Sequence, residues 1–152
     1  MSRETWAQYF MRVAETVASR SKDLSTKVGC VVVSEDKVIL SSGYNGIPGG
    51  VKDLPERMER PAKYVWTSHA EENAVALAAR VGSGLKGSTA YVTHHPCSRC
   101  ARILIQAGIT RVFVGPGTTS MPEEEFVVAA QMFEEAGVIV LLHQTVVEIV
   151  NG

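Results

Sequence analysis

The sequence lacks several features that would assign the protein to particular classes. It has no apolar run long enough to cross a membrane, and its N-terminal stretch, MSRETWAQYF, lacks the apolar core of a secretory signal peptide. It has no excess of positive charge, because 15 Lys and Arg are offset by 16 Asp and Glu. A membrane or a long nucleic acid is therefore not expected as a partner, and a small molecule is. The chain has only three cysteines, an odd number that implies no disulfide framework, so we expect a cytoplasmic location.

What is present indicates an ordinary globular protein. The chain has 152 residues, of which 45% are hydrophobic and 20% are charged. No internal repeat, low-complexity tract or linker divides it. We therefore expect one domain over residues 1–152.

Two short motifs contain the residues best suited to chemistry. His69 and Glu71 stand two residues apart, and Cys97 and Cys100 follow in the stretch PCSRC. One imidazole and two thiolates are good zinc ligands, and three protein ligands leave a fourth position open for water, as in a catalytic site. A purely structural zinc site would need a fourth protein ligand and would give Glu71 no role.

The spacing is compatible with one metal centre at the ends of two helices. Residues 69–81 read as a helix for which Thr67 or Ser68 is the N-cap candidate. Because positions i and i+2 point to opposite sides of a helix, the metal must lie off the helix end. Residues 97–108 read as a second helix with Pro96 at its start and both cysteines on one face. Two helix N-termini would then meet at the metal and favour thiolates.

Hydrophobic periodicity predicts the remaining elements and an α/β fold. A helix over residues 3–20, capped by Ser2, carries the apolar stripe Trp6, Phe10, Val13 and Val17, which we expect in the core. Strands separated by helices imply a partly parallel sheet, so we expect a mixed five-stranded sheet between helical layers, with the metal at its carboxyl edge. The tail 144–152 is compatible with an edge strand, a subunit contact or a frayed end. The other predicted elements are strands at 27–34, 37–43, 88–94, 111–115 and 138–143, a loop at 115–121, and a helix at 122–137.

Several residues outside the two motifs are candidates for a binding pocket. The glycine-rich loop 43–50 contains Asn45, whose amide suits a sugar hydroxyl or a base edge. The long polar segment 51–66 is typical of a lid or binding loop, and it ends with Tyr64 and Trp66 just before His69. His95 precedes the cysteines and is a candidate substrate contact. Cys30 lies in an apolar strand, and we expect it in the core.

Four segments together resemble the deoxycytidylate (dCMP) deaminases of the zinc-dependent cytidine deaminase superfamily. The H-x-E and P-C-x-x-C motifs are those of zinc nucleobase deaminases in general. The resemblance extends from about Tyr9 to His143. The segments are SKDLSTKVG at 21–29, GYNG at 43–46, KYVW at 63–66 leading into HAEENA at 69–74, and PCSRCARILIQAGI at 96–109.

The resemblance implies a fold, a reaction and a set of residue roles. The fold would be the three-layer α/β/α cytidine-deaminase-like fold. The reaction would be hydrolysis of dCMP to dUMP and ammonia, in pyrimidine metabolism that leads to dTTP. Glu71 would carry protons from water to the ring nitrogen and the leaving amine. Zinc would be bound by His69, Cys97 and Cys100, the deoxyribose by Asn45, and the phosphate near Ser21, Lys22, Thr26, Lys27 and Tyr64.

The family also suggests an oligomer and regulation. Members are often homohexamers that are activated by dCTP and inhibited by dTTP. The effector loop would comprise Gly43, Tyr44, Asn45, Gly46 and Ile47. This chain has Ile47 and Gly49 where members often have Phe and Arg, which argues against such regulation and makes a 5-substituted dCMP or dCTP an alternative substrate.

Three other functions share some of these features. A tRNA adenosine deaminase has the same zinc motif but needs a basic face for RNA. A free-nucleoside cytidine deaminase usually has an additional cysteine ligand and lacks GYNG. A catalytically silent zinc protein that acts as an oligomerisation partner would have no use for Glu71. A viral origin would place the protein in the host cytoplasm.

Overall fold

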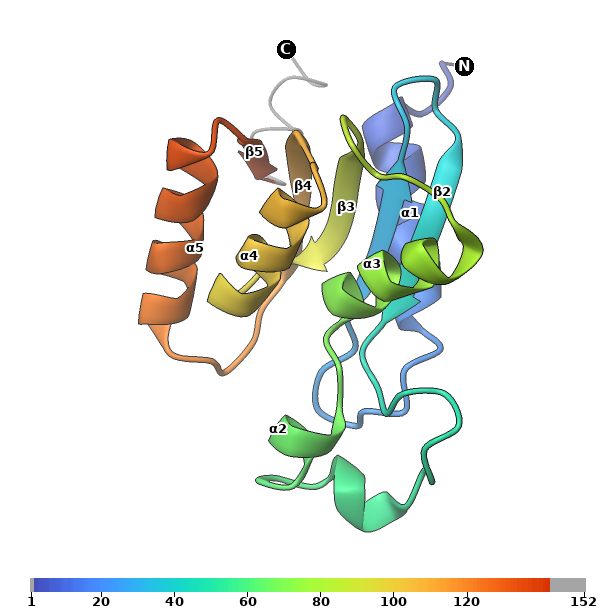
Figure 1. Ribbon diagram of the computed structural model, residues 1–152, viewed down its shortest axis with the longest axis vertical. Coiled ribbons are helices and arrows are strands. Elements are labelled where there is room, and N and C mark those ends of the chain that lie inside the picture. Colours follow the sequence, from blue (N-terminus) through green and yellow to red (C-terminus); the bar gives the residue numbers. More distant parts are fainter. Residues whose placement is uncertain (1, 143–152) are drawn as a thin grey trace.

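The computed structural model describes residues 2–142, in which a mixed five-stranded sheet forms the centre (Figure 1). The strand order is β2-β1-β3-β4-β5. β1 runs antiparallel to both β2 and β3, whereas β3, β4 and β5 are parallel to one another. The predicted mixed α/β sheet is therefore confirmed. The strands are β1 (Gly29–Val33), β2 (Ile39–Tyr44), β3 (Thr89–His94), β4 (Arg111–Gly117) and β5 (Ile139–Leu142).

Helices cover both faces of the sheet, as a three-layer fold requires. α1 (Trp6–Ala18) lies on one face, while α3 (Ala70–Val81), α4 (Ser98–Gln106) and α5 (Glu123–Glu135) lie on the other (Figure 1). Because side chains alternate along a strand, Val31 and Val33 of β1 pack in the α1 layer, and Cys30 and Val32 pack in the opposite layer. Cys30 is fully buried there, as expected. No helix within residues 2–142 is long and apolar enough to span a membrane.

The first helix begins later than predicted. Thr5, and not Ser2, is the N-cap, because its hydroxyl accepts a hydrogen bond from the backbone N–H of Gln8 at 3.2 Å, and the Gln8 side chain accepts one from the N–H of Thr5 at 2.8 Å. Phe10 is buried as predicted. The expectation for Trp6 is wrong: it lies in the first turn, stacks on Phe10 with ring centroids 5.6 Å apart, and remains 56% exposed.

The C-terminal half also departs from prediction at one strand end. β4 continues through Gly117, although the sequence suggested a strand at 111–115 followed by a loop. Pairing with β3 explains the extension, because Gly117 lies opposite His94 after a register shift, and a Cβ at residue 117 would lie only 2.4 Å from the His94 ring. β5 agrees with the predicted strand up to residue 142. The tail 144–152 lies outside the described residues.

A glycine of the GYNG motif determines how closely α3 approaches the sheet. A Cβ on Gly43 would lie 2.4 Å from both the carbonyl oxygen of Ala70 and the backbone nitrogen of Ala74. Two hydrogen bonds hold this contact: Ser41 Oγ donates to the Ala74 carbonyl at 2.6 Å, and Asn73 Nδ2 donates to the Tyr44 carbonyl at 2.7 Å. The backbone of β2 therefore fixes the N-terminal half of α3.

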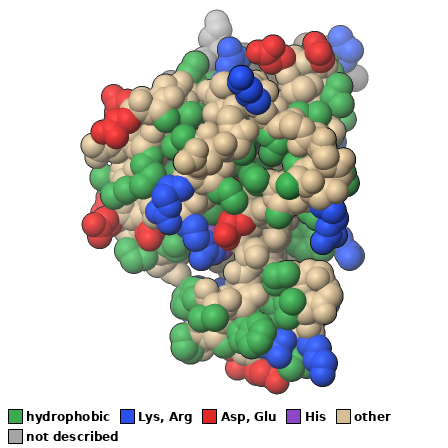
Figure 2. Space-filling view, in the orientation of Figure 1, with side chains coloured by type: hydrophobic (Ala, Val, Ile, Leu, Met, Phe, Trp, Pro, Cys, Tyr) green, Lys and Arg blue, Asp and Glu red, His purple; other side chains and the backbone are tan. Residues whose placement is uncertain are grey.

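The segment between β2 and α3 leaves the sheet and forms a separate lobe. It contains the short helices η1 (Pro55–Met58) and α2 (Lys63–Trp66). Figure 2 shows this lobe below the main body, with hydrophobic side chains on its surface. The predicted irregular segment 51–66 is thus partly helical.

Candidate active site

The imidazole of His69 and the thiols of Cys97 and Cys100 converge on one point. Nδ1 of His69 lies 3.4 Å from Sγ of Cys97 and 3.3 Å from Sγ of Cys100, and the three ligand atoms all lie within 4.8 Å of one another. Tetrahedral zinc, with Zn–N near 2.0 Å and Zn–S near 2.3 Å, would place such atoms about 3.6 Å apart. The three side chains therefore fit zinc.

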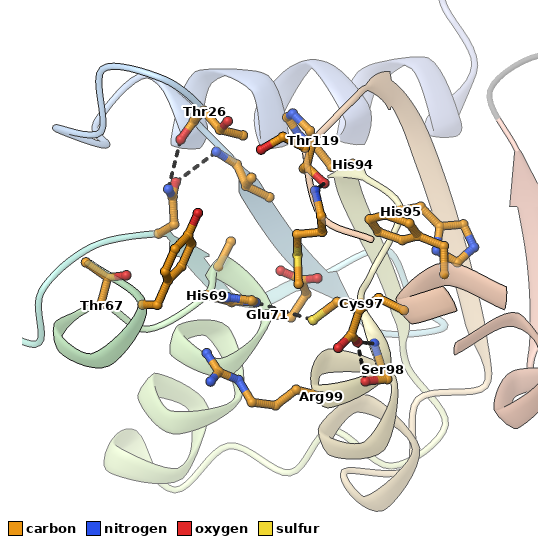
Figure 3. A pocket seen from close by; sticks show the side chains of 18 of the residues that line it. Thr26, Thr67, His69, Glu71, His94, His95, Cys97, Ser98, Arg99 and Thr119 are labelled. Carbon is orange, nitrogen blue, oxygen red and sulfur yellow. Dashed lines mark hydrogen bonds between the residues drawn. The ribbon is translucent and has the colours of Figure 1, made fainter. Parts of the chain in front are cut away.

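Two helix N-termini bring these side chains together. His69 is the N-cap of α3, and Cys97 is the N-cap of α4 (Figure 3). Cys100 lies in the first turn of α4. The predicted caps Thr67 and Ser68 are wrong: Thr67 donates through its hydroxyl to the Lys63 carbonyl at 2.6 Å, and the backbone of Ser68 pairs with Gly46. The ligands do lie beyond the end of α3, as the spacing of His69 and Glu71 requires.

The two thiols have opposite tendencies to ionise. The pKa of Cys97 is lowered to about 4, chiefly by a hydrogen bond from the Cys100 thiol, with a further contribution from His69. The pKa of Cys100 is raised, because it is the donor in that bond and is buried. A hydrogen bond between His69 and Cys97 raises the pKa of His69. A first thiolate in this buried site thus disfavours ionisation of the second thiol. A divalent cation bound between them would allow both thiols to ionise.

Glu71 lies beside this group in the first turn of α3 (Figure 3). It is only 4% exposed, and burial raises its pKa to about 7. A carboxyl group with a pKa near neutrality is suited both to accept and to release a proton. Its position in the cavity wall makes such transfer accessible to a bound ligand.

A cavity of about 470 Å³ opens in front of these residues. Among the other residues predicted for the site, the structure places Thr26, Asn45, Tyr64 and His95 in its wall. It does not place Ser21, Lys22 or Lys27 there, and among the loop residues 43–50 it places only Asn45 there. Of the expected phosphate contacts, Thr26 and Tyr64 therefore lie in the cavity wall, and the other three do not.

Asn45 supports the cavity wall through its amide. Its Oδ1 accepts a hydrogen bond from the backbone N–H of Val28 at 2.8 Å, and its Nδ2 donates to the Thr26 carbonyl at 2.9 Å. The hydroxyl of Ser21 donates to the Asn45 carbonyl at 2.8 Å. Among residues 2–142, the second N–H of the Asn45 amide has no hydrogen-bond partner.

The lobe and the loop before α5 meet over the cavity. Nη2 of Arg60 donates to Oγ of Ser120 at 3.2 Å, and both residues line the cavity. Tyr64 lines it as well, whereas Trp66 lies outside against Arg57, whose guanidinium carbon is 3.7 Å from the indole centroid. Of the two aromatic residues, only Tyr64 can therefore contact a ligand here.

The two histidines before the cysteines both line the cavity. Nδ1 of His95 donates to the carbonyl oxygen of Pro96 at 2.8 Å, and its ring meets Phe126 edge-on with centroids 5.8 Å apart. His94 is held through Nδ1 by the hydroxyl of Thr93 at 2.7 Å. Within residues 2–142, the only group of metal-binding side chains is the one formed by His69, Cys97 and Cys100.

Sequence reasoning did not identify a large part of the cavity wall. The segment after β4 and the first turn of α5 contribute residues from the far side. A signal was available, because this segment follows a parallel strand at the carboxyl edge of the sheet. The unpredicted wall residues include Arg60, Lys63, Arg99, Arg102, Thr119, Ser120, Met121, Pro122, Glu125 and Phe126.

A buried ion pair at the base of the lobe yields a stability prediction. Nζ of Lys63 lies 3.0 Å from Oδ2 of Asp23, and the two side chains are only 9% and 7% exposed. Replacing Lys63 by Met leaves the Asp23 carboxylate buried without its cation. We expect a loss of about 3–5 kcal/mol in the free energy of unfolding, measured by urea denaturation.

The matched control is Lys22→Met. Lys22 pairs with Asp53 on the surface, where its side chain is 75% exposed. Removing an exposed pair should cost at most about 1 kcal/mol. Equal losses in the two variants would show that the Lys63–Asp23 pair does not stabilise the lobe.

Several known proteins resemble this chain over most of its length. Residues 4–116 match the family described as the cytidine and deoxycytidylate deaminase zinc-binding region. An uncharacterized deaminase from the luxG 3′ region of Aliivibrio fischeri is 43% identical over 88% of this chain and 90% of its own. The deoxycytidylate deaminase of Mus musculus is 39% identical over 88% of this chain and 76% of its own.

A solved structure extends the likeness to three dimensions. The dCMP deaminase of cyanophage S-TIM5, in complex with dCMP and dUMP, superposes with a TM-score of 0.75 at 26% identity, covering 93% of this chain and 99% of that one. The chain belongs to the cytidine and deoxycytidylate deaminase zinc-binding family. It is thus a zinc deaminase, as its motifs predicted, and His69, Cys97 and Cys100 form its candidate zinc site.

Proposed function

We propose that the protein hydrolyses dCMP to dUMP and ammonia. The observation that carries the proposal is the buried Glu71 beside the three convergent zinc ligands, in the wall of a cavity large enough for a nucleotide. The relatives support dCMP as the substrate, because two of the similar proteins are dCMP deaminases and one was solved with dCMP and dUMP.

The roles that we assign follow from position and chemistry. When bound, zinc supplies the nucleophile by lowering the pKa of a coordinated water molecule to about 7. Glu71 would accept one proton of the attacking water and deliver it to the ring nitrogen. It would then carry the second water proton, from the hydroxyl that has added to the ring carbon, to the amine, which leaves as ammonia. Its raised pKa suits it to both transfers.

The remaining wall residues would bind and orient the nucleotide. We assign the amide of Asn45 to the deoxyribose, and Thr26 and Tyr64 to the phosphate, because all three residues line the cavity. Ser21 would act indirectly, by holding the backbone of Asn45. Lys22 and Lys27 lie outside the wall, so we assign them no contact in this cavity.

The positions of Ile47 and Gly49 bear on the alternative substrates. Ile47 and Gly49 do not line the cavity, so their small size does not enlarge it. A 5-substituted dCMP or dCTP therefore has no specific support from the cavity wall. Regulation by dCTP and dTTP, and assembly into a hexamer, remain predictions from the family.

A substrate panel tests the proposal. We would measure ammonia release from cytidine, dCMP, 5-methyl-dCMP, dCTP and a tRNA anticodon stem, with zinc quantified in the same sample and with dCTP or dTTP added in parallel. We expect turnover of dCMP above all others. Activity on the tRNA stem alone would refute the assignment of dCMP, and preferred turnover of 5-methyl-dCMP or dCTP would replace it with the corresponding alternative.

A further inference from the structure

The two residues between the thiolates, Ser98 and Arg99, are each held by a carboxylate from a different helix. The backbone N–H of Ser98 donates to Oε2 of Glu125 at 3.0 Å, and its hydroxyl donates to the same oxygen. Glu125 lies in the first turn of α5 and packs next to α4. The N–H of Ser98 is one of the backbone donors at the start of α4 that have no partner within the helix. Glu125, a residue of α5, therefore caps α4.

The second carboxylate belongs to Glu72 in the first turn of α3. Its Oε1 accepts a hydrogen bond from Nη2 of Arg99 at 2.8 Å and another from the backbone N–H of His69 at 2.8 Å. One oxygen thus connects the residue that carries the imidazole ligand to the residue between the two thiolates. Neither Glu72 nor Glu125 belongs to the group of candidate ligands itself.

We propose that Glu72 and Glu125 are positioning residues that hold the zinc ligands at the distances the metal requires. We call them the two brace carboxylates. The proposal rests on the proposed zinc-dependent function. Together they connect α3, α4 and α5 at the metal: Glu125 fixes the first turn of α4, and Glu72 fixes that turn relative to His69.

The need for such braces follows from where the ligands lie in the chain. His69 and Cys97 are 28 residues apart, on separate helices, so local backbone geometry cannot set the distance between them. Partners just outside the ligand shell orient metal ligands and typically change metal affinity or activity by about 10- to 100-fold. A carboxylate at a helix start is also stabilised there by the backbone dipoles. In agreement, hydrogen bonds from the hydroxyl and then the backbone N–H of Ser98 lower the pKa of Glu125.

The test measures how firmly the protein holds zinc, without reference to substrate. The variants are Glu125→Ala and Glu72→Ala, and the rate of zinc release into the chelating dye 4-(2-pyridylazo)resorcinol is recorded. We expect release to be about 10- to 100-fold faster in both. The matched control is Glu124→Ala, which removes an exposed acidic residue from the same turn of α5 and should release zinc at the wild-type rate.

Two further variants distinguish positioning from a general loss of structure. Glu125→Gln keeps an oxygen that can accept from Ser98 and should release zinc at a rate between wild type and Glu125→Ala. Arg99→Ala removes only one of the two hydrogen bonds that Glu72 accepts, so it should have a smaller effect than Glu72→Ala. The visible absorption of the cobalt-substituted protein should change in the alanine variants and not in Glu124→Ala.

The outcomes separate this proposal from the proposed function. If wild-type protein holds zinc and the Glu72 and Glu125 variants release it no faster than Glu124→Ala, the brace proposal is wrong and the deaminase assignment stands. If the wild-type protein binds no zinc, both fail. If an alanine variant of Glu72 or Glu125 unfolds at room temperature by circular dichroism, Glu125→Gln and Arg99→Ala decide the matter, because both should release zinc faster than Glu124→Ala and equal rates would refute the braces.

Discussion

Replacing Glu71 by Gln should reduce dCMP turnover by roughly 10²- to 10⁴-fold, the range typical for loss of a general acid–base group. Glutamine has the size and shape of glutamate, but it cannot accept and return a proton. Zinc content should remain at the wild-type level, because Glu71 is not among the three convergent ligands. The measurement is ammonia release alongside zinc quantification, with kcat and KM determined separately so that a loss of chemistry is distinguished from a loss of binding.

The stability of the same variant provides an independent check. Burial raises the pKa of Glu71 from 4.5 to about 7, so the stability of the metal-free protein falls as the pH rises between these two values, and the full cost of the buried carboxylate remains above pH 7. A neutral glutamine has no such cost, so the metal-free variant should be at least as stable as wild type at pH 7.5. The control, Glu124→Gln, removes an exposed charge and should leave turnover unchanged. Turnover at the wild-type rate by Glu71→Gln would exclude Glu71 as the proton carrier.

Replacing Cys97 by Ala should weaken zinc binding by more than ~100-fold, since changes outside the ligand shell already cost about 10- to 100-fold. The remaining imidazole and thiol are too few ligands for a stable tetrahedral site. Activity should be lost with the metal. Zinc bound after dialysis against a metal buffer, measured by atomic absorption, gives the result directly.

Cys30 provides the matched control for that experiment. It is also a buried thiol, but it lies in β1 and does not belong to the convergent group. Cys30→Ala should keep its zinc, with at most a small loss of stability from the missing sulfur. Equal zinc loss in the two variants, or full zinc content in Cys97→Ala, would contradict the ligand assignment.

The metal centre was predictable because each half is local in sequence. The spacing of His69 and Glu71 and the spacing of Cys97 and Cys100 each define a short piece of backbone, and helix geometry then places the metal beyond the helix ends. The mixed sheet was predictable for a similar reason, because alternation and breaker residues mark strands individually. The cap of α3 was not: Thr67 and Ser68 have good capping side chains, yet Glu72 already binds the backbone N–H of His69 and makes His69 the cap.

The substrate-facing wall was less predictable because it is made by contacts between distant segments. The Lys63–Asp23 pair joins residues 40 positions apart, and the Arg60–Ser120 hydrogen bond joins residues 60 apart. No periodicity relates such positions. Conversely, Lys22 and Lys27 have suitable charges close to Thr26 in sequence, but their side chains lie outside the cavity wall. The positive charges of Lys22 and Lys27 suggested phosphate contacts, but the backbone places both residues outside the cavity wall.

Because the three ligands come from two helices, bound zinc affects how much of the protein stays folded in a cell. α3 rests on the antiparallel part of the sheet and α4 lies beside its parallel part, so a metal bound by both joins the two parts across the fold (Figure 1). A ligand that binds only the folded chain adds about 1.4 kcal/mol to the unfolding free energy for each tenfold rise in its concentration above Kd. Zinc supply would therefore control the lifetime of the protein as well as its chemistry, and zinc-starved cells would degrade it faster.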